Sequence, residues 1–174
     1  MEQFFEKVTS QTDPFKKVAS FIPGFSGYID RQNRRDADKL LRDTVARRFD
    51  EQWSRASQLQ SDMVSSGMIE FVDDMEKAAI KLRTFIDKIT TAPRGYSGLF
   101  DAVKINEKEL EAIYQYDAAF FDLAEQVGRA LDNVEASLGD PAALPAAIRN
   151  VTSLARMAVE TYNRRSEVVI DAGK

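Results

Sequence analysis

Apolar residues recur at helical spacing over most of the chain, and this period predicts four long helices. Short clusters rich in glycine, proline and serine interrupt the pattern and mark turns. Because proline is favoured in the first turn of a helix, the last helix is expected to begin at Pro141 or Pro145. The four predicted helices comprise approximately residues 28–65, 69–90, 106–138 and 141–170.

The turns at 65–67 and 139–141 are short, so each joins two helices that run in opposite directions. The helix over 106–138 keeps a heptad spacing, which is typical of coiled-coil packing. We therefore expect an all-α protein, an up-down-up-down antiparallel four-helix bundle that forms a single domain over residues 28–174. The first helix, roughly 57 Å long at 1.5 Å per residue, would extend beyond the second.

An N-terminal arm, residues 1–27, precedes this bundle. Within it, Phe15, Val18 and Ile22 share one face of a short amphipathic helix that Asp13 and Pro14 would begin. The arm has two interpretations: it folds back onto the overhang of the first helix, or it docks on a partner protein or a membrane. Because the arm carries as many acidic residues as lysines, attraction to an anionic membrane is the weaker version.

A glycine–aromatic–serine–glycine sequence occurs twice, at 24–27 and at 95–98. Paired glycines suit chain reversals that need a positive φ. In the predicted topology both loops and the arm lie at the same end of the bundle, which makes that end the candidate interaction surface. Its candidate residues are Phe15, Val18, Phe21, Ile22, Phe25, Tyr28, Arg94, Tyr96 and Phe100.

Two charged residues occupy apolar positions of the last two helices. Asp117 and Arg165 fall opposite one another when these helices are paired through their short turn. We expect a partly buried Asp117–Arg165 pair that fixes helix register, with Arg164 as the alternative partner. A catalytic role for the carboxylate is the competing interpretation.

The composition of the chain excludes several kinds of metal site and catalytic site. The chain has neither histidine nor cysteine, which removes the usual ligands of zinc, haem and iron–sulfur clusters and the usual nucleophile and base of hydrolases. We expect no metal and no cofactor. The carboxylates of 70–76 lie mostly off the apolar stripe of their helix and lack the spacing of a calcium loop.

A net charge of −4 argues against a protein that binds nucleic acid. A basic cluster at the start of the first helix is interleaved with acidic residues at ion-pairing distance, so we interpret it as salt-bridged surface. Its members are Arg31, Arg34, Asp36, Asp38, Lys39, Arg42 and Asp43, with Arg35 between them.

No run of apolar residues is long enough to span a bilayer, and the first residues lack the pattern of a signal peptide. We expect a cytoplasmic location.

The segment Pro23-Gly24-Phe25-Ser26-Gly27-Tyr28, together with Arg34-Arg35-Asp36-Ala37-Asp38-Lys39-Leu40-Leu41-Arg42, resembles uncharacterised bacterial all-helical proteins. The resemblance covers less than a quarter of the chain. It implies a bacterial helical protein and carries no activity or site.

These observations favour a non-enzymatic interaction or scaffolding module that docks on a partner protein or self-associates through the arm end. One alternative is a small-ligand sensor or enzyme with an aromatic-lined pocket at that end, where Arg94 or Arg165 would hold an anion. A second alternative is a peripheral membrane protein anchored by the arm. The aromatic lining of the pocket would be Phe25, Tyr28, Tyr96, Phe100 and Tyr114.

Overall fold

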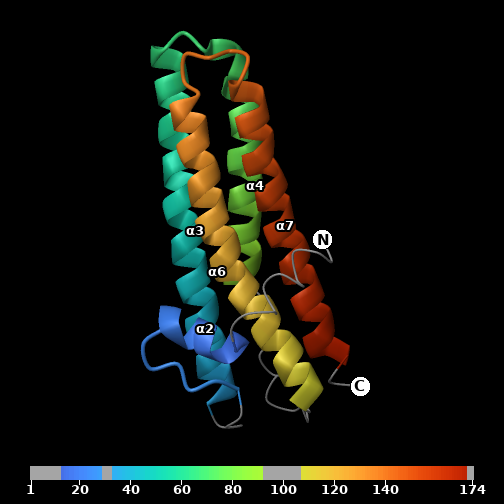
Figure 1. Cartoon of the computed structure of the whole chain (residues 1–174). Coiled ribbons are helices and arrows are strands. Elements are labelled where there is room, and N and C mark those ends of the chain that lie inside the picture. The colour runs from blue at the N-terminus through green and yellow to red at the C-terminus, as the bar shows by residue number, and fades with distance from the viewer. Residues whose placement is uncertain (1–12, 29–32, 92–106, 172–174) are drawn as a thin grey trace.

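The computed structural model describes residues 13–28, 33–91 and 107–171. All secondary structure within these residues is helical, and five α-helices pack together (Figure 1). The elements are α2 (Pro14–Phe21), α3 (Arg34–Ser65), the 3₁₀ turn η1 (Ile69–Phe71), α4 (Val72–Thr90), α6 (Glu107–Ala136) and α7 (Leu144–Asp171).

The helix ends follow local chemistry. The Asp13 carboxylate accepts a hydrogen bond from the Phe15 amide at 3.0 Å, and Pro14 is the first residue of α2, as the sequence predicts. At the start of α7, the Asp140 carboxylate accepts from the amide of Ala142 at 3.0 Å. α7 therefore begins at Leu144, three residues after the earlier of the two expected positions.

The expectation that the first long helix begins near Tyr28 is wrong. α3 begins at Arg34, and Tyr28 belongs to the preceding loop, where its side chain is fully buried. Gly27 has φ +76°, which takes the backbone out of the right-handed helical region just before Tyr28. The glycine thus turns the loop so that Tyr28 enters the core from outside the helices.

Helix α3 packs against α4. Gln60 of α3 donates a hydrogen bond to Glu76 of α4, whereas Arg42, much earlier in α3, donates to the Ile89 carbonyl near the end of α4. Between these two levels the guanidinium of Arg83 lies 5.3 Å from the ring centre of Trp53. α6 and α7 pack together as the second pair of long helices.

The two pairs meet through α3 with α6 and through α4 with α7. Along the first of these contacts the residue numbers rise together. Arg165 joins Asp38 of α3 to Asp117 of α6, and further along Arg55 of α3 bonds Asp132 of α6. In Figure 1, the colours accordingly show that residue numbers in α3 and α6 rise toward the same end of the molecule, where the turns that follow these two helices lie.

α6 is the most enclosed helix, because α2 packs on it in addition to α3 and α7. Five consecutive residues, 117–121, are buried, so this part of α6 has no exposed face. Ala119 and Phe121 are buried together with Asp117 and Phe120, on more than one side of the helix.

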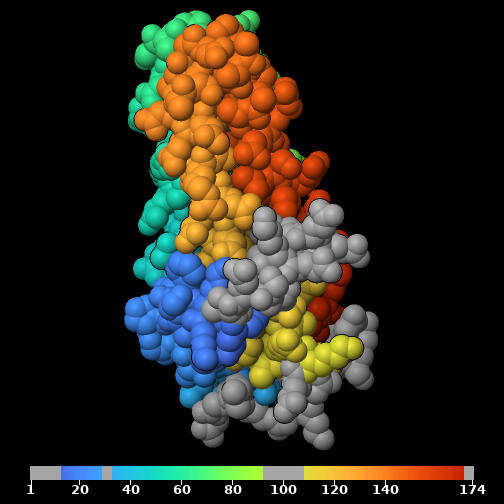
Figure 2. All heavy atoms as spheres, viewed as in Figure 1, coloured from blue at the N-terminus to red at the C-terminus, as the bar shows by residue number. Residues whose placement is uncertain are grey.

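The arm helix α2 packs against α6, whereas one of the two interpretations drawn from the sequence placed it on the overhang of the first long helix. Figure 2 shows α2 as part of the molecular surface at one end of the bundle, beside the first half of α6. α3 contributes Arg48, whose guanidinium lies 5.1 Å from the ring centre of Phe21. The position on the overhang is therefore corrected to a seat on α6 with α3 alongside.

Among the described residues, no helix combines the length and the apolar character that crossing a bilayer requires.

Candidate interaction site at the arm end

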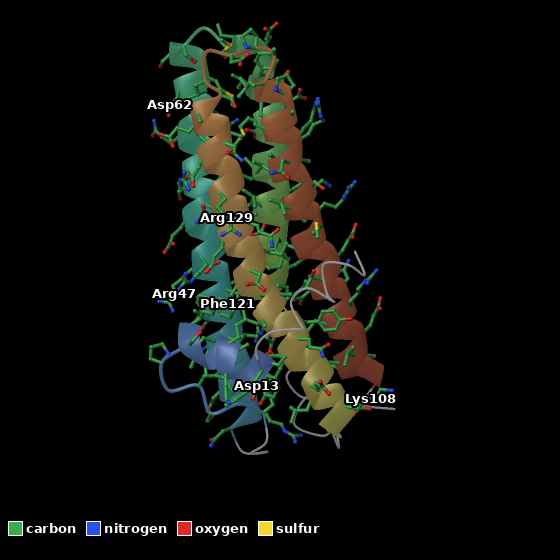
Figure 3. All side chains as sticks on the ribbon, viewed as in Figure 1. Asp13, Arg47, Asp62, Lys108, Phe121 and Arg129 are labelled. Atoms are coloured by element: carbon green, nitrogen blue, oxygen red, sulfur yellow. The ribbon has the colours of Figure 1, made fainter. Side chains whose placement is uncertain are left out.

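The apolar face of α2 is turned inward. Val18 is 0% exposed and Ile22 2% exposed, and the ring of Phe21 stacks on Phe121 of α6 with centres 4.5 Å apart and planes 5° apart. Figure 3 labels Phe121 on α6 beside this helix. At the edge of the contact the Lys17 ammonium lies 2.5 Å from the Asp122 carboxylate. An aromatic stack and a half-buried ion pair thus hold α2 on α6.

The loop after α2 continues the apolar contact as an aromatic cluster. The rings of Tyr28 and Tyr114 stack with centres 5.2 Å apart, and Phe25 meets Tyr28 edge to face at 5.6 Å. Phe15 of α2 approaches Tyr114 edge to face at 5.3 Å. Such pairs contribute about 0.5–1.5 kcal/mol each beyond the area that they bury. The cluster therefore attaches the loop as well as the helix.

Gly27 is required by this arrangement for two reasons. Its φ of +76° is one that side chains with a Cβ rarely adopt. A Cβ at this position would also overlap the Tyr114 hydroxyl and the ring of Phe15. That hydroxyl accepts a hydrogen bond from the Tyr28 amide at 2.8 Å, so it has no freedom to move aside.

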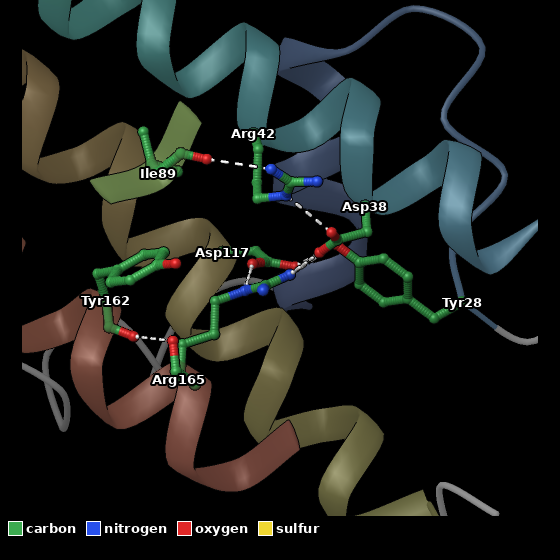
Figure 4. A network of polar contacts seen from close by, with 8 residues as sticks. Tyr28, Asp38, Arg42, Ile89, Asp117, Tyr162 and Arg165 are labelled. Carbon is green, nitrogen blue, oxygen red and sulfur yellow. Dashed lines mark hydrogen bonds and ion pairs between the residues drawn. The ribbon is translucent and has the colours of Figure 1, made fainter. Parts of the chain in front are cut away.

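Behind the aromatic cluster lies a buried polar network (Figure 4). The Tyr28 hydroxyl donates to Asp117 Oδ2 at 2.7 Å, and Arg165 Nε donates to Asp117 Oδ1 at 2.6 Å. Arg165 also donates through Nη2 to Asp38 Oδ1 at 2.8 Å. Three helices and the loop are joined by these bonds.

Arg42 extends the network to the fourth long helix. Its Nε donates to Asp38 Oδ2 at 2.8 Å, and its Nη1 donates to the Ile89 carbonyl at 3.2 Å, at the end of α4. The carbonyl of Tyr28 accepts a hydrogen bond from Arg34 Nε. The network lies at the level where α4 ends and α3, α6 and α7 continue (Figure 1).

Burial governs the titration of this network. Desolvation raises the pKa of Asp117, while the adjacent Arg165 guanidinium acts in the opposite direction. Burial also raises the pKa of Tyr28 well above its ordinary value, which keeps the phenol protonated and able to donate. Within the described residues every buried side-chain nitrogen and oxygen has a hydrogen-bond partner. The polar groups of the network therefore satisfy one another.

The ion pair expected between Asp117 and Arg165 is present, and both side chains are more deeply buried than expected, at 0% and 1% exposed. Arg164, the alternative partner, is exposed. Sequence reasoning missed Asp38 and Tyr28 as further partners. The spacing of Asp38 and Arg42 was recognised as ion-pairing, but the expected salt-bridged surface is corrected here, because Asp38 is 2% exposed.

The candidate interaction surface is largely occupied by the chain itself. Val18, Ile22, Phe25 and Tyr28 are buried, and Phe15 and Phe21 are half-buried. An arm inserted in a membrane would have to present this apolar face, which lies against α6 instead. The remaining candidates lie outside the described residues: Arg94, Tyr96 and Phe100.

Of the five aromatic residues expected to line a pocket, three pack against one another, Phe25, Tyr28 and Tyr114. The other two, Tyr96 and Phe100, lie outside the described residues. Arg165, one of the two proposed anion holders, bonds two carboxylates of the chain. In the same described ranges no group of three carboxylates gathers closely enough to hold a metal ion.

No protein family, curated protein or solved structure matches this chain.

Proposed function

We propose that the four long helices form a four-helix bundle made of two antiparallel hairpins, α3 with α4 and α6 with α7. The opposed contacts of Gln60 and Arg42 with α4 support the first hairpin, and the Asp117–Arg165 pair supports the second. The contacts of Arg55 with α6 favour like-directed helices where the hairpins meet. In chain order the four helices then run up, down, up and down, and the two hairpins meet through like-directed neighbours, α3 with α6 and α4 with α7.

This bundle acts as a non-enzymatic interaction or scaffolding module and docks through its arm end. The observation that carries the proposal is the seat of α2 on α6. Phe21 and Lys17 of a short amphipathic helix find an aromatic ring and a carboxylate side by side on α6. A bundle face that holds one amphipathic helix in this way has the apolar surface and the charged edge that helix recognition requires.

The buried network supports this function by keeping the arm end in one geometry. It ties Tyr28 to α6 and α7, and Arg42 ties α3 to the end of α4. A buried ion pair contributes little net stability but penalises alternative packings that would leave its charges unpaired. Its role here is to hold the helices that carry the docking face in a fixed register.

Affinity capture from lysate with the full chain tests the proposal. Val18→Asp places a charge on the buried face of α2, and Ser20→Asp places the same charge on its exposed face as the matched control. We expect Val18→Asp, which detaches α2 and exposes the α6 face, to capture more protein than the wild type and Ser20→Asp do. Circular dichroism of each variant verifies that the long helices remain folded.

Recovery of the same proteins by all three chains would contradict docking through the arm end, since α2 would then be irrelevant to capture.

A further inference from the structure

We infer that the α6 surface beneath α2 accepts the α2 helix of a second copy of this chain, so that two copies exchange their arms reciprocally. The inference rests on the proposed docking function and names its occupant. Phe121 and Asp122 of α6 define this arm-binding surface. There, α2 is held by side-chain contacts with a part of the sequence about a hundred residues away.

The arm-binding surface recognises a specific pattern. Lys17 and Phe21 are four residues apart and therefore lie on one side of α2, where they meet the adjacent Asp122 and Phe121. Val18 and the following Ile22 repeat this spacing and fill the apolar contact. A helix must carry lysine, two aliphatic residues and an aromatic ring at these positions to make the same contacts, and every copy of the chain supplies one.

Charge favours this occupant. Residues 106–140 contain nine acidic and two basic side chains, whereas the charged residues within α2 are Lys16 and Lys17. Asp122 is half-buried at 17% exposed, so its attraction for a lysine is less screened than that of a fully exposed pair. The surface is thus complementary to the arm in charge as well as in shape.

The connection between α2 and the rest of the chain provides a hinge. Pro23 and Gly24 are exposed, and a Cβ placed on Gly24 would meet nothing within 4 Å. Beyond them, Phe25 and Tyr28 remain fixed in the aromatic cluster. Rotation about Gly24 therefore moves α2 away and leaves Phe25 and Tyr28 in place, once two contacts have opened. These are the hydrogen bond from the Phe25 amide to the Ile22 carbonyl and the contact of the Phe15 ring with Tyr114.

Docking in trans forms the same contacts as docking in cis, so the balance depends on protein concentration and on the hinge. Reciprocal exchange leaves neither arm-binding surface exposed and closes after two copies, because each copy gives one helix and receives one. An unrelated partner would have to displace α2 from α6, and the displaced α2 would then have no matching site on that partner to occupy.

Charge reversal on opposite sides of the contact tests the exchange. Lys17→Glu places a carboxylate on the arm opposite Asp122, and Asp122→Lys places an ammonium on the arm-binding surface opposite Lys17. Each variant alone has therefore lost its ion pair. Mixing the two variants restores the attraction only in a heterodimer whose arms have been exchanged. Native mass spectrometry, with one variant labelled with ¹⁵N, measures this heterodimer.

We expect the association constant of the mixed pair to exceed that of either variant with itself by about five- to thirty-fold, the combined effect of two restored ion pairs. Lys16→Glu mixed with Asp122→Lys is the matched control, because Lys16 lies on the exposed side of α2. The double variant Lys17→Glu/Asp122→Lys restores the pair within one chain. Its far-ultraviolet dichroism and melting should match those of the wild type.

The exchange would be overturned if Lys17→Glu and Asp122→Lys, once mixed, both remained monomeric. The mixture is compared with the wild type by native mass spectrometry over the same range of concentrations. A heterodimer that forms equally well with Lys16→Glu would also overturn the exchange. If capture of other proteins still depends on Val18 in that case, docking through the arm end survives and its occupant is another protein. If capture is also unaffected, both proposals fail.

Discussion

Two glycines of the loop after α2 have the same backbone conformation and different surroundings. Gly24 and Gly27 have φ of +78° and +76°, but only Gly27 is enclosed, by Tyr114 and Phe15. Strain from the positive φ is thus common to both positions, and steric overlap belongs to one. The pair separates these two effects on the stability of the arm end.

We expect Gly24→Ala to lower the free energy of unfolding by about 1 kcal/mol, the cost of a positive φ for a residue with a Cβ. Gly27→Ala should cost about 2–3 kcal/mol more than this, because the Tyr28 amide loses its bond to Tyr114 as the loop moves. Urea unfolding followed by circular dichroism measures both. Equal losses would contradict the overlap at Gly27.

The guanidinium of Arg165 is the centre of the buried network. Removing it with Arg165→Met leaves Asp38 and Asp117 facing one another without the cation that they share. We expect a loss of about 3–5 kcal/mol in unfolding free energy. Arg164→Met, one residue earlier and exposed, is the control and should change stability by less than about 0.5 kcal/mol.

The titration of Asp117 gives stability a defined pH dependence. Burial raises its pKa in the folded chain above the ordinary value of 3.8, so the folded state binds this proton more tightly than the unfolded chain does. The stabilising contribution is complete below the unfolded pKa and is lost as the pH rises through the folded pKa. Wild type should therefore gain stability over Asp117→Asn as the pH falls through this window.

Urea titrations of the two proteins at successive pH values measure that difference. A difference that stays constant would show that the ion pair with Arg165 cancels desolvation, and one that shrinks on acidification would show that the ion pair outweighs it; either result would contradict the prediction.

At the scale of elements, α2 is attached through fewer contacts than any long helix. Phe21→Ala removes the stack on Phe121 and the contact with Arg48 while leaving the long helices unchanged. We expect amide exchange in α2 to accelerate by at least about tenfold, with α6 and α7 retaining their protection. Hydrogen exchange with mass spectrometry resolves the two regions, and equal acceleration throughout would show that α2 does not move independently.

The helices themselves follow from sequence periodicity more reliably than their ends or neighbours do. The spacing of apolar residues indicated each long helix, and Asp13 with Pro14 indicated the start of α2. The start of α3 could not be read in the same way, because residues 30–36 are all charged or polar and no apolar stripe marks where the helix begins. Gly27, with its positive φ, leaves Tyr28 in the loop. A stripe identifies buried positions without showing which element covers them.

Some residues of the candidate site could likewise be predicted from the sequence, and others could not. Asp117 and Arg165 were accessible from sequence because they interrupt apolar stripes on two helices joined by a short turn. Asp38 was not, because it stands in a run of alternating charges. Only the packing of α3 on α6 and the bond to Arg165 distinguish this buried carboxylate from an exposed one. The stack of Phe21 on Phe121 depends on a helix contact that no local pattern specifies.

At the scale of the whole molecule, the direction of α3 relative to α6 is open to a direct test. Arg55 bonds Asp132 and the Gly128 carbonyl, which pairs the later parts of both helices. The chain has no cysteine, so introduced pairs react alone. We expect a short bismaleimide to join Arg55→Cys to Asp132→Cys and not to join Arg55→Cys to Glu111→Cys. Mass spectrometry of tryptic peptides identifies the product, and the opposite preference would reverse the assignment of direction.

The single tryptophan, Trp53, lies on α3 under the guanidinium of Arg83 of α4, whereas α2 packs on α6. Its fluorescence, excited at wavelengths that tyrosine hardly absorbs, therefore reports the separation of α3 from α4 and is silent when the arm leaves. One native optical signal consequently distinguishes global melting from local detachment, without a dye or a label being attached to the protein.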